Sequence, residues 1–278
     1  MARFFMTKMN LSKLILKLYP VAIDAYYQGI SRKRLDEIRN LLVLEIDLSS
    51  SFIRVGDEND GGYVLVDDIS QKDVCLSFGI GSNYSFDSAM AKLCSEIRMF
   101  DHTIKEPKHL SSNMTFSALG LASESKVNFV TLGEVLNQLQ PENDIILKID
   151  IEGDEWEILN GLSCHNLLRF KQIVIELHGI LEVANEVKFR RVVSALEILN
   201  KTHSLRNLHA NNWAKIEIIR GIATPDVIEA TYVRRKEGIS ESNQSVDMLP
   251  ELNQSNNGNL PDAQISFISK LRINASIQ

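Results

Sequence analysis

The chain has 278 residues, of which 44% are hydrophobic and 24% charged, and its net charge is −6. That composition is ordinary for a globular protein and suffices for one large domain with appendages, while the acidic balance disfavours general binding to nucleic acid. No apolar stretch is long enough to cross a bilayer. Three cysteines without metal-like spacing, Cys75, Cys94 and Cys164, predict reduced thiols and a cytoplasmic location.

Residues 1–47 are predicted to form a basic helical segment that is broken at Pro20. Ser31 is the expected N-cap of an amphipathic helix from Arg32 to Leu44. Residues 1–40 carry a net charge of +5, which leaves −11 on the rest of the chain. A helix packed on its own domain is favoured over a weak contact with a membrane surface, which would make the protein peripheral to the membrane. No small-residue cleavage site follows, so we do not expect a signal peptide.

A hairpin is predicted next. Phe52–Gly56 and a second strand-like run, Gly61–Val66, flank a polar turn, Asp57–Asp60. The two glycines after Asp60 permit positive φ or the close approach of a ligand, and a simple turn is the plainer interpretation.

From Asp73 onward, strands alternate with helices, which predicts a doubly wound α/β domain with a mostly parallel sheet over residues 48–236. No helix is predicted between the last two strands, so this pair is expected to be antiparallel. The predicted strands are Val74–Phe78, Ile97–Phe100, Thr115–Leu119, Ile145–Ile149, Ile173–Leu177, Leu205–Leu208 and Val227–Val233. The predicted helices are Phe86–Cys94, Leu132–Gln140, Glu155–Leu162 and Val187–Asn200.

Residues 237–278 form a polar tail. Glu237–Gln264 is rich in Ser, Asn, Gln and Gly and is predicted to be disordered, because it cannot bury enough apolar surface to offset the entropy of ordering. The mildly amphipathic Ile265–Ile273 is a segment that can dock back onto the domain.

A glycine loop follows the first strand of the alternating region. Gly79 and Gly81 allow the backbone to turn sharply beside a ligand, although the third glycine of the dinucleotide fingerprint is replaced by Tyr84. Asp101 lies 22 residues after Gly79, at about the offset where an acid binds a ribose, and His102 follows it. Together these residues favour an adenosine-type nucleotide over a simple loop cap.

An acidic turn follows the strand Ile145–Ile149. Asp150 and Glu152 stand at the carboxyl end of that strand, where open parallel sheets bind ligands. The alternative role for Asp150 is to cap the helix that follows.

Polar side chains also follow the next two strands, namely His178 after one and His209, Asn211 and Asn212 after the other. Several such groups at one edge of a sheet indicate a site, where histidine acts as a base or, with carboxylates, holds a metal ion.

Two cofactors fit this outline, and the missing third glycine argues against NAD. The antiparallel last pair argues for S-adenosylmethionine, because the terminal strand of the methyltransferase sheet runs opposite to the others. An NAD-dependent oxidoreductase that uses the same corner, and a catalytically inactive binding protein on a methyltransferase-like scaffold, are the alternatives.

Most of residues 52–235 resemble the FkbM-type family of S-adenosylmethionine-dependent methyltransferases. The most specific match is Leu147–Trp156, which is similar to the Lys-x-Asp-x-Glu-Gly signature of that family. Ser77 departs from many methyltransferases, which have an acid at the start of the glycine loop. Further matching blocks are Arg54-x-Gly, Asp60-Gly-Gly-Tyr, Phe78-Gly-Ile-Gly, Phe100-Asp-His-Thr, Val174-Ile-Glu-Leu-His, His209-Ala-Asn-Asn-Trp and Glu229-Ala-Thr-Tyr.

The resemblance implies a seven-stranded Rossmann-like class I methyltransferase sheet and O-methylation of a sugar, glycan precursor or other small molecule. It implies that S-adenosylmethionine is held by Gly79, Gly81, Asn83, Asp101, His102 and Asp150, with the methionine and ribose on the glycines and Asn83, the ribose hydroxyls on Asp101 and the adenine near His102.

The resemblance also frames the chemistry. The sulfonium needs no activation, so the enzyme aligns the acceptor and removes its proton. His178 and His209 are the candidate bases, and Asp150 is expected near the transferable methyl group. If a divalent metal ion takes part, its expected ligands are Asp150, Glu152 and His178. The expected substrate-binding residues are Asp60, Glu152, Asn211 and Asn212.

Overall fold

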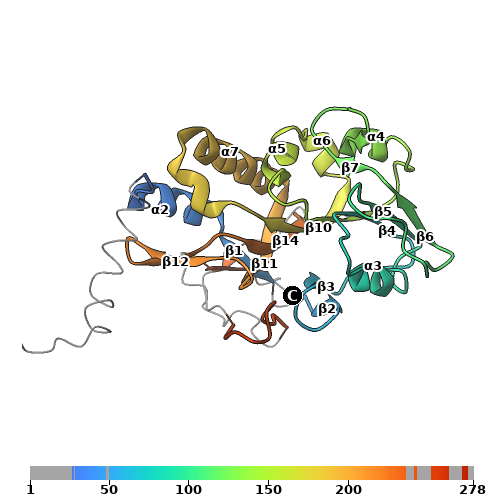
Figure 1. Ribbon diagram of the computed structural model, residues 1–278, viewed down its shortest axis with the longest axis horizontal. Helices are drawn as coiled ribbons and strands as arrows, with labels where there is room; N and C mark the ends of the chain where they lie inside the picture. Colours follow the sequence, from blue (N-terminus) through green and yellow to red (C-terminus); the bar gives the residue numbers. More distant parts are fainter. Residues whose placement is uncertain are drawn as a thin grey trace, which may run out of the picture.

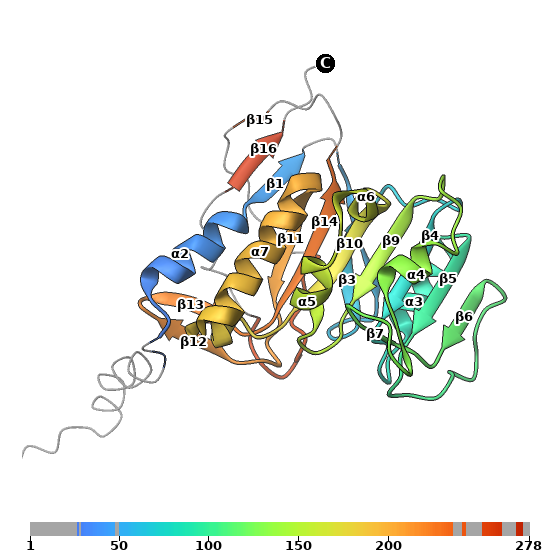
Figure 2. The same cartoon turned by 90° about the horizontal axis from the view of Figure 1, so that it is seen from above.

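The computed structural model describes residues 27, 29–47, 50–235, 241–242, 252–262 and 271–274. A sheet of ten strands dominates this part of the chain (Figures 1 and 2). Seven of its strands belong to the alternating region: β4 (Val74–Phe78), β5 (Glu96–Phe100), β6 (Met114–Ser117), β9 (Ile145–Ile149), β10 (Phe170–Leu177), β11 (His203–Ala210) and β14 (Ile228–Arg234). The other three are β1 (Leu44–Asp47), β15 (Glu241–Ser242) and β16 (Leu271–Asn274).

The strand order is β15-β16-β1-β11-β14-β10-β9-β4-β5-β6, and Figure 2 shows it from edge to edge. Strands β6, β5, β4, β9 and β10 run parallel to one another. Strand β14 lies between β10 and β11 and is antiparallel to both. The predicted doubly wound, mostly parallel sheet with an antiparallel last strand is therefore confirmed. The last strand is antiparallel because no crossover helix connects β11 to β14.

Helices cover both faces of the sheet (Figure 1). On one face, α7 (Glu186–Thr202) buries Phe189, Val192, Leu196 and Leu199, which recur at helical spacing against the strands. On the other face α3 (Ser85–Met90) packs beside the hairpin of β2 (Phe52–Gly56) and β3 (Gly62–Val66). The remaining helices are α2 (Arg32–Leu41), α4 (Leu132–Leu136), α5 (Glu155–Asn160), α6 (Cys164–Leu167) and the 3₁₀ helix η1 (Ile180–Ala184).

Two small pairings complete the structure: β7 (Gly120–Leu121) with β8 (Phe129–Val130), and β12 (Ile216–Ile219) with β13 (Ile222–Pro225). The hairpin predicted around the double glycine is present as β2 and β3, and Ser31 caps α2 by accepting a hydrogen bond from the backbone N–H of Arg34 at 3.2 Å. No helix in the described ranges is both long and apolar enough to cross a bilayer.

The sheet is wider than the seven strands expected. Leu44–Asp47 was expected to close the helical segment but forms the strand β1, which pairs with β11 and with β16. A parallel sheet that ended at β11 would leave an edge of unpaired backbone groups, and β1 covers that edge. Apolar and acidic residues alternate from Leu44 to Asp47, which is a strand pattern. At four residues it is too short to outweigh the helical pattern of the preceding residues in a prediction from sequence.

The predicted disorder of the tail does not hold for residues 252–262. This segment lies against the domain, and the side chain of Asn256 in it is buried. Its hydrogen bonds are to the hairpin and to the ends of β11 and β14, so polar contacts order it where apolar burial does not. Residues 1–26 and the rest of the predicted disordered stretch, apart from Glu241 and Ser242, lie outside the described residues, and so does the predicted membrane-surface contact.

Candidate active site

A cavity of about 380 Å³ opens at the carboxyl ends of β4, β5 and β9. The topology requires a cleft there, because the helices that follow neighbouring strands cross to opposite faces of the sheet. Eight residues singled out in the sequence line this cavity: Asp60, Gly79, Gly81, Asn83, Asp101, His102, Asp150 and Glu152. Four others, His178, His209, Asn211 and Asn212, lie outside its wall.

The glycine loop has the backbone conformation that its composition predicts. Gly79 has φ +75° and Gly81 has φ +60°, a region that costs other residues free energy. A Cβ atom on Gly79 would stand 1.5 Å from the backbone oxygen of Asp150. The loop therefore presses against the end of β9, and only glycine fits at its first position.

Asp101 holds this loop from the neighbouring strand. One carboxylate oxygen accepts hydrogen bonds from the backbone N–H groups of Ile80 and Gly81, both at 2.9 Å. The other accepts from the backbone and hydroxyl of Thr103 at 2.7 and 2.6 Å. Burial alone would raise the pKa of Asp101, but these four hydrogen bonds outweigh it and lower the pKa. The carboxylate thus stays ionised, with its acceptor positions occupied by its own loops.

Two rings, tilted by 47° against each other, lie beside Asp101. The rings of His102 and Phe129 have centroids 4.6 Å apart, and both rings line the cavity. A Cβ atom on Gly120 would come within 2.5 Å of the Phe129 ring and 2.7 Å of His102 Nδ1, so glycine is needed for these rings to approach. Phe129 and Gly120 were missed in the sequence, because they lie on two-residue strands that have no periodic signal.

Three further residues of the site were also missed: Tyr63, Lys148 and Glu176. Lys148 is buried in β9, where its ammonium group donates to the backbone oxygen of Gly79 and lies 3.6 Å from Asp150 Oδ2. The hydroxyl of Tyr63 donates to Glu176 Oε1 at 3.0 Å. A signal was available for Lys148 and Glu176, since charged residues within apolar strand runs are rarely buried without a specific partner.

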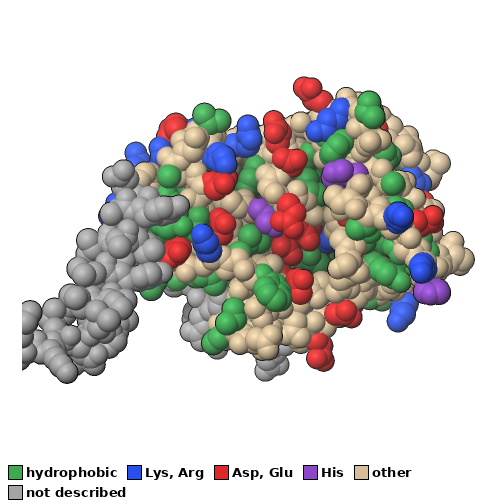
Figure 3. All heavy atoms as spheres, viewed as in Figure 1, with side chains coloured by type: hydrophobic (Ala, Val, Ile, Leu, Met, Phe, Trp, Pro, Cys, Tyr) green, Lys and Arg blue, Asp and Glu red, His purple; other side chains and the backbone are tan. Residues whose placement is uncertain are grey.

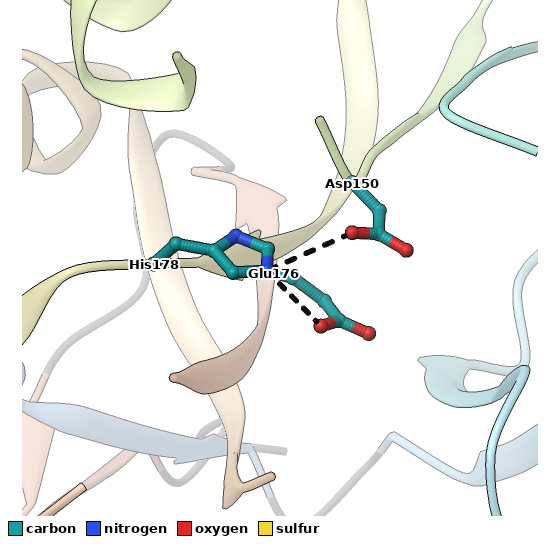
Figure 4. A group of neighbouring side chains, drawn as sticks. All are labelled: Asp150, Glu176 and His178. Carbon is teal, nitrogen blue, oxygen red and sulfur yellow. Dashed lines mark ion pairs between the residues drawn. The ribbon is translucent and has the colours of Figure 1, made fainter. Parts of the chain in front are cut away.

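Asp150, Glu176 and His178 form what we call the acid–imidazole cluster (Figure 4). One possible ligand atom from each lies within 4.8 Å of the others. His178 Nε2 lies 3.9 Å from Asp150 Oδ1 and 3.7 Å from Glu176 Oε2. His178 Nδ1 lies 3.0 Å from the fully buried carboxylate of Glu155, which orients the ring. Figure 3 shows acidic side chains gathered around a histidine in the middle of this face.

Both titratable groups at the centre of the cluster hold protons tightly. Burial, followed by the charges of Asp150 and Glu229, raises the pKa of Glu176 to about 8. Burial alone would lower the pKa of His178, but the hydrogen bond and charge of Glu155, with the nearby carboxylates, raise that pKa to about 9. At neutral pH His178 is therefore an imidazolium, which differs from the free base expected from the sequence.

These pKa values predict how stability depends on pH in the metal-free protein. At Glu176 the folded chain holds a proton that the unfolded chain loses between pH 4.5, the ordinary pKa of Glu, and about 8, and at His178 it does so between pH 6.5 and about 9, so the contribution of these two groups to the free energy of unfolding falls as pH rises through those windows. The expected loss is a few kcal/mol, since one unit of pKa difference corresponds to about 1.4 kcal/mol. Urea denaturation at several pH values measures it. In Glu176→Gln, the dependence of the free energy of unfolding on pH should become flatter between pH 5 and 8. The control Glu142→Gln, at an exposed position, should leave that dependence unchanged. Equal pH dependences in the two variants would contradict the prediction.

Glu152 lies at the edge of the cluster. Its carboxylate is 3.6 Å from His178 Nε2, but its side chain is 87% exposed. The set expected for a metal ion was Asp150, Glu152 and His178, whereas the three residues with possible ligand atoms within 4.8 Å of one another are Asp150, Glu176 and His178. Glu176 belongs to the Ile-Glu-Leu-His block, so its nearness to His178 follows from the alternation of β10.

The residues that follow β11 belong to a second network. His209 Nδ1 lies 3.1 Å from Glu229, and His209 Nε2 lies 2.9 Å from Asp262 in the tail segment. Burial alone would lower the pKa of His209, but the hydrogen bonds and charges of Glu229 and Asp262 together outweigh burial and raise it. With both ring nitrogens engaged, His209 has no free lone pair for the role of base.

The two asparagines divide between these networks. Asn211 donates to Glu176 Oε2 at 3.3 Å and so belongs with the acid–imidazole cluster. Asn212 donates to Ser255 at 2.6 Å and accepts from the backbone N–H of Asn257 at 2.7 Å. Its side chain therefore anchors the tail segment, and its expected contact with a substrate stays a prediction.

Comparison with known proteins identifies the middle of the chain. Residues 68–204 match the family model described as the methyltransferase FkbM domain, within the span where the resemblance was expected. The human protein named "Probable methyltransferase-like protein 24" is 28% identical over 133 residues, which cover 43% of this chain and 36% of that protein. The chain thus spans about a third of the length of this curated relative.

Two solved structures are similar at low level. A precorrin 8W decarboxylase from Methanobacterium thermoautotrophicum is 15% identical, with a TM-score of 0.34, over 60% of this chain and 83% of its own. An rRNA methylase from Streptococcus thermophilus is 10% identical, also with a TM-score of 0.34, over 60% of this chain and 90% of its own. Scores this low establish neither a ligand nor an activity.

Proposed function

Since residues 68–204 carry a methyltransferase FkbM domain, we propose that this chain is an S-adenosylmethionine-dependent methyltransferase. It transfers the methyl group to a hydroxyl oxygen of a small molecule, a sugar or glycan precursor. The observation that carries the proposal is the cavity of about 380 Å³ at the carboxyl ends of β4, β5 and β9, with the glycine loop in one wall and Asp150 of the acid–imidazole cluster in another.

The cofactor's parts have matching surfaces in this cavity. The turn at Gly79 and Gly81 leaves room for the methionine and ribose to approach the backbone. The rings of His102 and Phe129 offer a surface for the adenine. Asp101 holds the glycine loop in place through its hydrogen bonds to Ile80 and Gly81. To bind a ribose hydroxyl as well, Asp101 must give up at least one of its present hydrogen bonds.

The reaction needs a destination for one proton. The bond from sulfur to the methyl carbon breaks with its electron pair going to sulfur, the acceptor oxygen bonds to that carbon, and the hydroxyl proton must leave. Asp150 lines the cavity, so its carboxylate is the receiving group, and the imidazolium of His178 stabilises the charges around it. Glu152 and Asp60, which are exposed on the same wall, are the candidates for contacts with the acceptor.

A divalent metal ion fits the same cluster in a second form of this mechanism. Two carboxylates and an imidazole are a donor set that such ions accept, and Glu155 on His178 Nδ1 is the outer partner that commonly orients a metal-bound histidine. The ion would polarise the acceptor hydroxyl, and His178 and Glu176 would lose their protons when it binds.

Calorimetric titration with S-adenosylhomocysteine and with NAD, for the wild type and Asp101→Ala, tests the cofactor assignment. We expect S-adenosylhomocysteine alone to bind and Asp101→Ala to lose that binding at least 10-fold, because the loop loses four hydrogen bonds. Binding of NAD alone would make the same corner a dehydrogenase site. If neither ligand binds, the chain is a scaffold without this activity.

Turnover assays on a panel of hydroxylated acceptors, with and without divalent ions, then identify the substrate class and separate the two mechanisms. The net charge of −6 supports a small-molecule or glycan acceptor over nucleic acid. A cytoplasmic location stays a prediction.

A further inference from the structure

Asp87 is a buried acid that the mechanism above does not use. It lies on α3, its side chain is 2% exposed, and it lines the cavity. Its Oδ1 atom has no hydrogen-bond partner among the described residues. A buried carboxylate oxygen left unpaired costs free energy, so its presence on a ligand cavity calls for a ligand group.

Two neighbouring residues face the same side of the sheet. Ser77 of β4 pairs in register with Lys148 of β9. Two residues earlier in these strands, Cys75 and Ile146 belong to the same core cluster as the residues of α3. Side chains two residues apart in a strand point to the same side, so Ser77 and Lys148 also face α3. Ser77 Oγ is also buried, has no partner at normal hydrogen-bond distance in the described part of the chain, and lies near enough to the Asp87 carboxyl to affect its charge. Two orphan oxygens, one of them on the cavity wall, thus belong to the end of β4 and the helix that follows it.

The Asp87 carboxyl group has room for a positively charged partner. Burial raises the pKa of Asp87, and the charge of Lys148 and the nearby side chain of Ser77 only partly oppose it. The ammonium of Lys148 forms its hydrogen bond with the backbone oxygen of Gly79 and its ion pair with Asp150, so neither contact goes to Asp87. A cationic group of the ligand would both pair Asp87 Oδ1 and favour its ionised form.

The other acids on the cavity wall do not offer such an oxygen. Asp101 has four hydrogen bonds from its own loops. Glu152 and Asp154 are exposed, where water solvates their charges, and Asp60 has hydrogen bonds from Asn256 and from the backbone of Gly61. Asp150 belongs to the acid–imidazole cluster. Asp87 is therefore the carboxylate that a buried cation of the ligand would gain most from contacting.

We propose that Asp87 binds the α-ammonium group of the methionine part of S-adenosylmethionine, next to Ser77 at the end of β4. This assignment rests on the proposed function and deepens it. It answers the question raised by Ser77, which stands where many methyltransferases have an acid. The acid comes instead from the first turn of α3, and only the adjacent serine comes from the strand.

Three adenosine thioethers test this assignment by calorimetry. S-Adenosylhomocysteine carries both the ammonium and the carboxylate, its deaminated analogue keeps only the carboxylate, and methylthioadenosine lacks the whole amino-acid part. In the variant Asp87→Asn, which keeps the shape of the side chain, we expect S-adenosylhomocysteine to bind about 10- to 100-fold more weakly, as for the loss of a charge-assisted hydrogen bond. The other two ligands should bind within two-fold of wild type.

The ligand set makes each failure distinct. If Asp87→Asn weakens all three ligands equally, the residue supports the fold of the pocket and the assignment is wrong. If S-adenosylhomocysteine binds the variant as it binds wild type, the assignment is equally wrong. If wild type binds none of the three, the proposed function itself falls, and this inference with it. Asp154→Asn, which removes an exposed charge from the same cavity wall, is the matched control and should bind all three ligands as wild type does.

Discussion

Replacing His178 with glutamine should lower kcat by about 10²- to 10³-fold, the range expected for loss of one charge-stabilising group, while S-adenosylhomocysteine still binds within about three-fold of wild type. His178 Nε2 faces Asp150 and Glu176, and Glu155 holds its other nitrogen. Glutamine cannot carry the positive charge that stabilises these carboxylates. The ring lies outside the cavity wall, so the cofactor surface stays intact.

His209→Gln separates this role from a structural one. His209 was also a candidate base in the sequence, but both of its ring nitrogens are engaged, with Glu229 and Asp262. We expect this variant to keep kcat within a few-fold and to lose about 1–3 kcal/mol of stability, as when one partner leaves a buried hydrogen-bond network. His165→Gln, at an exposed position of α6, is the control. Full turnover in His178→Gln, or its loss in His209→Gln alone, would reverse the assignment.

Gly79→Ala should be the most disruptive single substitution in the glycine loop. Its φ of +75° disfavours a Cβ atom, and that atom would lie 1.5 Å from the backbone oxygen of Asp150. The backbone N–H of Gly79 donates to Phe100 and that of Asp150 to Phe78, both at 3.0 Å, so neither strand end can move freely. We expect a loss of about 3–5 kcal/mol in urea denaturation and loss of cofactor binding.

Gly81→Ala is the matched control for that experiment. Gly81 also has a positive φ, +60°, but none of the described residues beyond its chain neighbours has an atom within 4 Å of the Cβ position. Its substitution should cost only about 1–2 kcal/mol, from backbone strain alone. Equal losses for the two variants would mean that the contact between the loop and Asp150 does not restrict Gly79.

The core of the sheet was predictable because its signals are local. Ile145–Ile149 is apolar throughout apart from Lys148, and strand β9 has those same limits and is buried at every position. The absence of a helix between the last two strands correctly predicted their antiparallel pairing. The added strands β1 and β16 were missed, because four-residue strands depend on the edge that they cover.

The site was predictable where its residues follow directly after strands. Asp150 and His178 do so, and they meet because parallel strands end at the same edge of a sheet. Glu176, Tyr63 and Phe129 were not predicted, because each reaches the site from within a strand or from a separate hairpin. The ordered tail segment was missed because its contacts are polar, and composition reports only how much apolar surface a segment can bury.

By itself, the sequence determined the fold class, the glycine loop and the acidic strand ends, because periodicity, glycine content and strand-end polarity are local properties of the chain. Only the tertiary structure decided which polar groups share a site and which are already occupied. It placed Glu176 beside Asp150 and His178, and it joined His209 to the tail segment by a hydrogen bond. It also filled the acceptor positions of Asp101 and left one oxygen of Asp87 without a partner among the described residues. Such pairings depend on distances between segments far apart in the chain, and hydrogen bonds and charges act only at those short distances.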